Sequence, residues 1–241
     1  MERDSRRNFL ERATVGVGVT GMVASVAAIH GQSVAADVTE PSNRSEKIRI
    51  VALNGSPRRN KTTVEGLTIA LEAAKLIASD RIETEILHLV DYPFFDARLF
   101  GDRPLESREA FEALEAKLSE ASGVLVGSPV HNGGVSALVS IFFGQVTHTL
   151  LQGKVAAALS VGGARNGGQE HVIQTIQSYL MHEGMILPGT GITGRSGALC
   201  WNQKDSLAAD EAGRDLAGRI GRRVATLALA LPQGLLAETS K

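Results

Sequence analysis

The sequence predicts an α/β fold in which a parallel sheet is covered by helices on both faces. From residue 47 onward, short apolar runs alternate with longer segments whose apolar residues recur at helical spacing. One short run, residues 123–127, contains no polar side chain, as expected for a strand buried on both faces. Because a helical segment follows nearly every strand, right-handed crossovers are expected to place the strands parallel.

Five strands and five helices follow from this pattern. The expected strands are residues 48–53, 82–90, 123–127, 155–161 and 185–187. The expected helices are residues 63–77, 107–119, 138–143, 169–182 and 205–229. Thr62 or Thr63 is expected to cap the first helix, because threonine hydroxyls accept hydrogen bonds from first-turn N–H groups. Pro188 favours an edge position for the fifth strand, since proline has no N–H to donate to a neighbour.

The helix expected at residues 138–143 is apolar on nearly every side. A helix on a protein surface keeps a polar stripe, so this helix must be covered by other protein atoms. Either a partner subunit or later segments of the same chain would provide this cover.

The first 36 residues are expected to be an export signal. Arg6 and Arg7 precede an uncharged run, residues 13–29, that is diluted by glycine and short for a transmembrane helix. Residues 5–10 resemble the twin-arginine signal, which carries folded proteins across a bacterial membrane, and small residues form a cleavage site before Asp37. An uncleaved N-terminal anchor is the alternative.

This interpretation divides the chain into four parts and places the protein outside the cytoplasm. The parts are a signal peptide (1–36), a polar tether (37–47), one domain (48–231) and a C-terminal tail (232–241). We expect a periplasmic or otherwise extracytoplasmic protein that contacts the export machinery only transiently.

Composition excludes several functional classes. With 25 basic and 26 acidic residues, the 241-residue chain has a net charge of −1, so no basic face indicates nucleic-acid binding. Cys200 is the only cysteine, which excludes an internal disulfide, a cysteine-based zinc site and a cysteine-ligated iron–sulfur cluster. His171 and His182 would lie about 16 Å apart along one helix, too far to share an ion, so no metal site is expected.

Three loops follow the first, third and fourth expected strands. They are expected at the carboxyl edge of the sheet, where ligands bind in folds of this class. Residues 54–63 combine a glycine, hydroxyl side chains at a helix start and three cations, which is typical of a phosphate cradle. Residues 127–134 and 162–170 are rich in glycine and suit a flat ring lying against the backbone. Together the loops favour a planar ligand that bears a phosphate.

Each loop carries a motif. The motifs are Gly55-Ser56-Pro57-Arg58 with Thr62-Thr63, then Ser128-Pro129-Val130-His131-Asn132-Gly133, then Gly163-x-Arg165-x-Gly167-Gly168. This set resembles the NAD(P)H-dependent FMN reductases, a family that includes relatives of the iron–sulfur flavoproteins. The resemblance implies a flavodoxin-like three-layer sandwich, a five-stranded parallel sheet in the order 2-1-3-4-5, FMN at its carboxyl edge, and a homodimer or homotetramer. The cysteines that the iron–sulfur relatives carry after the second strand are absent from residues 91–96.

The resemblance also implies which residues hold FMN. Ser56, Arg58, Lys61, Thr62 and Thr63 are expected at the phosphate, Pro129, Val130, His131, Asn132 and Gly133 along the isoalloxazine ring, and Gly163 and Arg165 at its pyrimidine end. His131 is the one candidate for catalytic proton transfer, with a packing or hydrogen-bonding role as the alternative. Arg165, or the helix that begins near Gln169, is placed to stabilise negative charge on the reduced ring.

These observations predict an FMN-dependent oxidoreductase in which NAD(P)H is the donor and free flavin, a quinone or a similar small molecule is the acceptor. Because NAD(P)H is scarce outside the cytoplasmic membrane, the alternative is an exported flavodoxin-like electron carrier fed by another redox partner. A nucleotide hydrolase is a third candidate, since Gly55-x4-Asn60-Lys61-Thr62 differs by one residue from the P-loop pattern. That candidate requires a metal-binding aspartate at a buried strand end, which neither the third nor the fourth strand supplies, and only Asp91 after the second strand is available.

Overall fold

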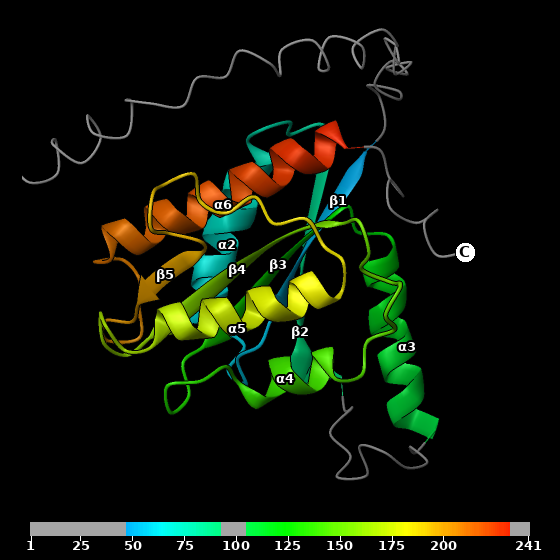
Figure 1. The fold of residues 1–241 in the computed structure, drawn as a ribbon, viewed down its shortest axis with the longest axis horizontal. Helices are drawn as coiled ribbons and strands as arrows, with labels where there is room; N and C mark the ends of the chain where they lie inside the picture. The colour runs from blue at the N-terminus through cyan, green and yellow to red at the C-terminus, as the bar shows by residue number, and fades with distance from the viewer. Residues whose placement is uncertain (1–46, 93–104, 232–241) are drawn as a thin grey trace, which may run out of the picture. The chain divides into compact units, whose positions relative to one another are not determined.

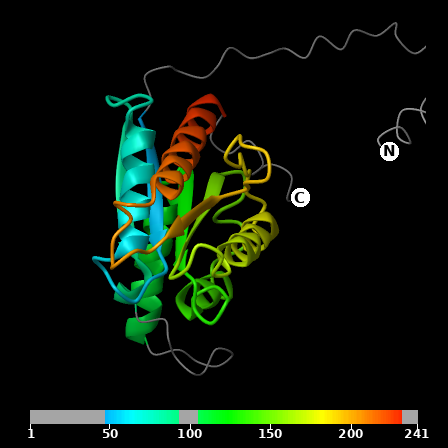
Figure 2. The ribbon, with the colours of Figure 1, turned by 90° about the vertical axis from the view of Figure 1, so that its left-hand side faces the viewer.

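The computed structural model describes residues 47–92 and 105–231. They form a five-stranded sheet that lies between two layers of helices (Figure 1 and Figure 2). The expected signal peptide and C-terminal tail lie outside the described residues, as does the tether except for Lys47. Among the described residues, no helix is long and apolar enough to cross a membrane.

The sheet has the predicted topology. Its strands are β1 (Ile48–Asn54), β2 (Ile82–His88), β3 (Gly123–Pro129), β4 (Val155–Gly162) and β5 (Ala198–Trp201). The helices are α2 (Thr62–Lys75), α3 (Leu105–Ser119), α4 (Ala137–Phe143), α5 (Gln169–His182) and α6 (Glu211–Ala230), and a short 3-10 helix, η2 (Leu89–Asp91), follows β2. All neighbouring strands are parallel, in the order β2-β1-β3-β4-β5. The flavodoxin-like fold expected from the sequence is confirmed.

The fifth strand lies in a different segment from the predicted one. Residues 185–187 contribute one isolated parallel bridge, in which Ile186 N donates to Lys154 O at 2.9 Å and Ala156 N to Ile186 O at 2.8 Å. The chain then leaves the sheet at Pro188 and passes through glycines with left-handed backbone, and pairing resumes where Ala198 lies beside Leu159 in β4. The edge position was predicted correctly, but the strand itself is β5.

The cap of α2 and the start of α6 also differ from the sequence prediction. The N-cap of α2 is Lys61, which makes no side-chain capping bond, and Thr62 and Thr63 are the first residues inside the helix. α6 begins at Glu211 rather than at residue 205, because Lys204 and Asp205 adopt left-handed backbone with φ of 54° and 61°. Left-handed residues cannot belong to a right-handed helix, so α6 starts after this turn.

Helix α4 is buried by its own chain. Phe142 is fully buried, and its ring lies 6.3 Å from that of Phe111 in α3. Phe143 stacks on Tyr179 of α5 at 5.1 Å between ring centroids. Segments of the same chain that precede and follow this apolar helix therefore cover most of it, whereas the sequence had offered only a partner subunit or later segments as the cover. The expected homodimer or homotetramer stays a prediction.

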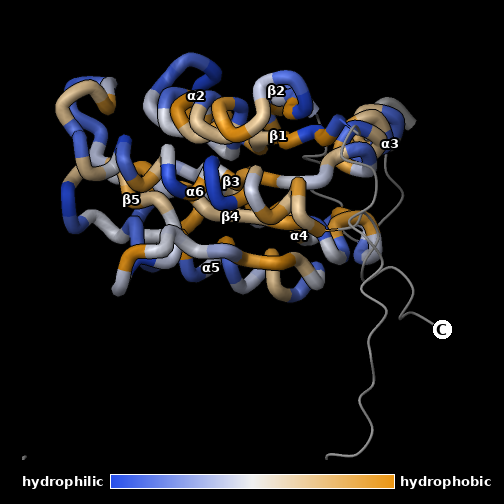
Figure 3. The backbone as a smooth tube through the Cα atoms, turned by 90° about the horizontal axis from the view of Figure 1, so that it is seen from above, coloured by the Kyte–Doolittle hydropathy of each residue, from blue (hydrophilic) through white to orange (hydrophobic). Residues whose placement is uncertain are grey.

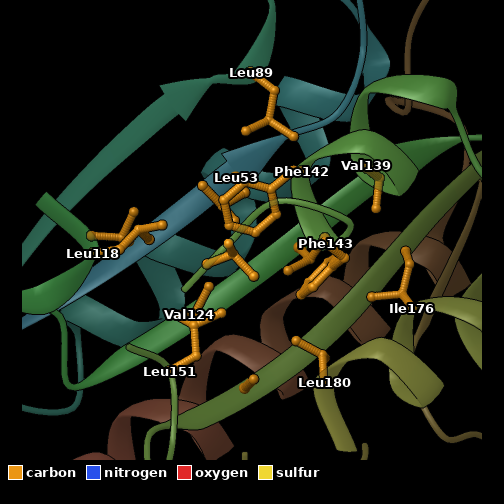
Figure 4. Packing of buried hydrophobic residues seen from close by; sticks show 14 of the residues in the cluster. Leu53, Leu89, Leu118, Val124, Val139, Phe142, Phe143, Leu151, Ile176 and Leu180 are labelled. Atoms are coloured by element: carbon orange, nitrogen blue, oxygen red, sulfur yellow. The ribbon is translucent and has the colours of Figure 1, made fainter. Parts of the chain in front are cut away.

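Two hydrophobic clusters, one on each face of the sheet, hold the layers together. α2 and α6 pack on one face, while α4 and α5 pack on the other (Figure 2), and buried side chains of α3 belong to the same cluster as those of α4 and α5. Side chains of β4 alternate between the clusters, with Ala158 facing α5 and Leu159 facing α2. Figure 3 shows the hydrophobic strands between the helical layers, and Figure 4 shows Phe142 and Phe143 among the aliphatic side chains of the α4 side.

Candidate cofactor site

The three predicted loops lie together at the carboxyl edge of the sheet, toward the lower left of Figure 1. Gly55 N donates to Gly127 O at 2.8 Å, and Ser136 Oγ donates to Gly55 O at 2.6 Å. These bonds join the first loop to the second. A Cβ atom on Gly168 would lie 3.2 Å from the carbonyl oxygen of Gly133, so the third loop touches the second. The loops therefore form one continuous surface.

Hydrogen bonds from Asn54 and Ser56 shape the first loop. Asn54 Oδ1 accepts from Ser56 N at 3.0 Å, and Asn54 Nδ2 donates to His88 Nδ1 at 2.9 Å. Ser56 Oγ in turn accepts from Arg58 N at 3.1 Å. The turn is thus fixed by its own polar groups and by the end of β2, which preorganises the backbone that follows.

The first turn of α2 has the features of an anion site. Ser56, Thr62 and Thr63 are buried, at 2%, 3% and 2% exposure, beside the N-terminus of this 14-residue helix. The first N–H groups of a helix have no partner within it, and the side chain of the N-cap residue, Lys61, has no oxygen to accept from them. Backbone donors, hydroxyl groups and the helix dipole together fit a phosphate group.

The three cations of this loop are each paired with a carboxylate. Asp205 binds Lys61 Nζ at 3.0 Å and Arg58 at 3.3 Å, and Arg59 binds Asp91 at 2.7 Å. The sequence analysis did not predict these ion pairs. Asp91 is also the aspartate that was available to bind a metal ion in the hydrolase alternative. Its carboxylate instead forms an ion pair with Arg59.

Gly55 is required by protein packing. A Cβ atom there would collide with Val139 Cγ2 and would lie 2.8 Å from the carbonyl oxygen of Gly127. The sequence analysis counted this glycine among the features of a phosphate cradle, and the structure shows that it lets the first two loops approach one another.

The second loop closes in a tight turn. His131 and Gly134 exchange backbone hydrogen bonds of 2.9 Å, with Asn132 and Gly133 between them at φ of 49° and 79°. Two successive left-handed residues define a type I′ turn, for which Asn-Gly is the favoured pair. This turn leaves His131 exposed at the tip of the loop.

A buried glutamine fixes the third loop. Gln169, at 1% exposure, donates from Nε2 to Ala164 O at 2.6 Å and accepts at Oε1 from Gly167 N at 2.8 Å. A Cβ atom on Gly163 would meet no atom within 4 Å, so the backbone there faces open space. A flat ring can approach the chain at that position.

Trp201 braces the third loop from the end of β5. Its Nε1 donates to Gly163 O at 3.4 Å, and the guanidinium carbon of Arg165 lies 4.7 Å from the centroid of its ring. The cation–π contact fixes the charge of Arg165 beside Gly163. An arginine in this place can stabilise negative charge on a ligand ring.

An apolar pocket of about 470 Å³ adjoins the first and second loops. It is lined by Pro57, Val90, Tyr92, His131, Ser136, Ala137 and Leu138. The pocket lies between the end of η2 and the start of α4, so the segment that follows β2 also contributes to the site. Within residues 47–92 and 105–231, no group of three or more His, Cys, Asp or Glu side chains is placed to hold a metal ion.

Sequence reasoning missed Trp201 and Asp205. Trp201 is the last residue of β5, and Asp205 lies in the turn that follows it. Both were missed because the fifth strand had been expected at residues 185–187. The apolar run Ala198–Trp201, followed by Asn202, is the signal that would have placed them at the carboxyl edge. Tyr92 and Leu138 were missed because nothing in their local sequence indicates a pocket.

The structure brings the predicted site residues together in three groups. Ser56, Arg58, Lys61, Thr62 and Thr63 surround the start of α2, residues 129–133 run from the end of β3 into the tight turn, and Gly163 and Arg165 lie by Trp201. Hydroxyl and N–H donors at one end and open backbone at the other fit the phosphate and the ring of FMN. The role of each residue stays a prediction.

Comparison with known proteins identifies the family. The sequence profile of the NADPH-dependent FMN reductases matches residues 48–196. An iron–sulfur flavoprotein of Methanocaldococcus jannaschii is 30% identical over 198 residues, covering 74% of this chain and 96% of that protein. An NAD(P)H dehydrogenase (quinone) of Trichlorobacter lovleyi is 32% identical over 81 residues, which is 32% of this chain and 40% of that one.

A solved structure supports the fold. The apo form of an NADH:FMN oxidoreductase superposes with a TM-score of 0.55 at 21% identity, covering 78% of this chain and 91% of that one. The profile spans more than half of the chain, from β1 to the segment before β5. The chain therefore belongs to the NADPH-dependent FMN reductase family and, as its member, is an FMN oxidoreductase with NAD(P)H as its co-substrate.

Proposed function

We propose that this protein passes electrons from NAD(P)H, by way of FMN, to a small, planar and largely apolar acceptor of the quinone type. The observation that carries the proposal is the pocket of about 470 Å³ beside the cofactor site. Pro57 and His131 belong both to the pocket and to the cofactor loops, so a molecule in the pocket would lie next to the flavin. An apolar lining favours a ring with few charges, because burying a charge there without a partner is costly.

The residues of the chain bind and orient the reactants. When bound, FMN supplies a carrier that takes a hydride from nicotinamide and passes both electrons on. Ser56, Thr62 and Thr63 hold its phosphate, and the open backbone at Gly163 accommodates the ring. His131, exposed at the edge of the pocket, donates a proton to an acceptor oxygen as that oxygen gains negative charge.

The cysteine content supports a direct route from flavin to acceptor. Cys200 is the only cysteine in the chain and is fully buried, so the chain cannot build a cysteine-ligated cluster as its relatives named iron–sulfur flavoproteins do. A relative named NAD(P)H dehydrogenase (quinone) adds support for the acceptor class.

The test fills the pocket by a substitution outside the cofactor loops. Ala137 lies at the exposed start of α4 and lines the pocket, and Ala137→Trp would occupy it. Using the FMN-loaded full-length chain under anaerobic conditions, we expect kcat/KM for benzoquinone to fall about tenfold or more in this variant. Bleaching of the flavin by NADPH in a stopped-flow experiment should keep its wild-type rate.

Ala230→Trp is the matched control, because Ala230 is also exposed but lies at the other end of the fold, where α6 ends. It should leave both reactions unchanged. Unchanged benzoquinone reduction in Ala137→Trp would contradict the pocket as the acceptor site. If NADPH and NADH both fail to bleach the flavin while a chemical reductant succeeds, the carrier alternative replaces the enzyme.

We also propose that the protein is exported through the signal in its first 36 residues. The support is the Arg6-Arg7 pair followed by an uncharged run and small residues. Fractionation of the source cells should find the protein outside the cytoplasm, with Asp37 at its N-terminus. The double variant Arg6→Lys, Arg7→Lys should retain it inside, whereas export of that variant at the wild-type level would contradict the assignment.

A further inference from the structure

Asp205 lies against the phosphate loop although it is far away in sequence. Its two carboxylate oxygens each bind one cation of that loop, Oδ1 at 3.3 Å from Arg58 Nη1 and Oδ2 at 3.0 Å from Lys61 Nζ. The pKa of Asp205 is lowered because Lys61 donates a hydrogen bond to it and both cations attract its charge. The carboxylate is therefore ionised at neutral pH.

The turn that carries Asp205 is fixed in place. Gln203 and Ser206 exchange backbone hydrogen bonds of 3.0 and 3.2 Å around the left-handed residues of the turn. The next residue, Leu207, is fully buried, and its N–H donates to Glu65 Oε2 in α2 at 3.0 Å. Asp205 is thus held near the start of α2 by contacts that do not involve Arg58 or Lys61.

We propose that Asp205 competes with the FMN phosphate for Arg58 and Lys61, and so sets how strongly the protein distinguishes FMN from riboflavin. This inference rests on the assignment of the phosphate to residues 56–63. A phosphate monoester dianion at the start of α2 would face the same two cations that the carboxylate now binds. Both anions cannot hold them fully, and they repel one another at short range.

The expected effect follows from the exposure of these groups. The ion pairs are partly solvated, with side-chain exposures of 53%, 40% and 48% for Arg58, Lys61 and Asp205. Removing the competing charge should therefore tighten FMN binding by only about three- to tenfold. Riboflavin has no phosphate, so its affinity should not change. The difference should shrink at high salt, where exposed charges are screened.

The experiment measures flavin affinity directly. Free FMN and riboflavin are titrated with the full-length chain, and the loss of flavin fluorescence gives each Kd. Asp205→Asn is the test variant, since asparagine also tolerates the left-handed backbone at this position. Asp91→Asn is the matched control, because Asp91 pairs with Arg59 and not with the two cations that Asp205 holds. Asp205→Glu restores the charge and should return the affinity for FMN toward that of the wild type.

The outcomes distinguish failure of this proposal from failure of the phosphate assignment on which it rests. Tighter FMN binding in Asp205→Asn alone, with riboflavin unchanged, supports the proposal. Unchanged or weaker FMN binding in that variant overturns it, and weaker binding would show that the carboxylate holds the cations in place for phosphate. If the wild type binds riboflavin as tightly as FMN, the phosphate assignment fails and the proposal fails with it.

Discussion

Helices α2 and α6 pack so closely that one position on α6 accepts only glycine. A Cβ atom on Gly221 would collide with the carbonyl oxygen of Ala70 and would lie 2.6 Å from its carbonyl carbon. Both atoms belong to the backbone of α2, so no side-chain rotation relieves the contact, and the helices must separate. Overpacking of this kind costs about 3 kcal/mol, at the upper end of the usual range. Alanine gains about 1 kcal/mol over glycine in helix propensity, which leaves a net loss of about 2 kcal/mol.

Gly218, one turn earlier on the same helix, gives the opposite expectation. A Cβ atom there would meet only the mobile end of Arg222 at 3.2 Å and Ala73 Cβ at 3.7 Å. Gly218→Ala should therefore gain about 0.5 to 1 kcal/mol from propensity alone. Thermal unfolding of the full-length chain should show Tm lowered by about 4 to 8 °C in Gly221→Ala and raised by about 1 to 4 °C in Gly218→Ala. Equal shifts of the same sign in the two variants would refute this account of the α2–α6 contact.

Three further outcomes are expected. Cys200 is fully buried and burial raises its pKa, so iodoacetamide should label it only after unfolding, and rapid labelling of the native chain would contradict its placement. Burial also raises the pKa of Glu183, an effect that His148 partly offsets. Stability should therefore fall as pH rises through that pKa, and denaturant titrations of Glu183→Gln should lack this part of the pH dependence. Trp201 is the only tryptophan and contacts Gly163, so FMN should quench its fluorescence, and unchanged emission would place the ring elsewhere.

The central strands could be predicted because their signal is local. β1, β3 and β4 are buried along nearly their whole length, and a strand buried on both faces has an apolar sequence. β5 has only four residues, of which two are half-buried, so it competes poorly with the apolar residues 185–187. Residues 185–187 do lie beside the start of β4 through Ile186. Apolar character therefore marked the correct edge of the sheet but the wrong segment.

The start of α6 could not be predicted from periodicity. Residues 205–210 continue the apolar spacing of the helix, but the left-handed backbone at Lys204 and Asp205 and the cap at Asp210 delay its first turn. The side chain of Asp210 accepts from Gly213 N at 3.2 Å and from Trp201 N at 2.6 Å. A cap that also binds the end of β5 depends on tertiary contact, which no window of sequence contains.

The three cofactor loops could also be predicted from local sequence, but the turn after β5 could not. Glycine, hydroxyl and cationic residues within a few positions of a strand end identify the first three loops. The turn after β5 contains no such cluster, and its role depends on which strand precedes it. Once β5 is placed, Trp201 and Asp205 necessarily lie at the carboxyl edge, because parallel strands end on the same side.

The end of β5 and the turn that follows it reach both ends of the cofactor site from residues only four positions apart. Trp201 contacts Gly163 and Arg165 at the ring end, whereas Asp205 contacts the cations at the phosphate end. Substitutions at these two positions should therefore affect different parts of flavin recognition. A change at Trp201 alters the loop that both riboflavin and FMN would contact, so both affinities should change. A change at Asp205 acts only on a ligand that carries a phosphate. The same short segment can thus control ring binding and phosphate selection separately.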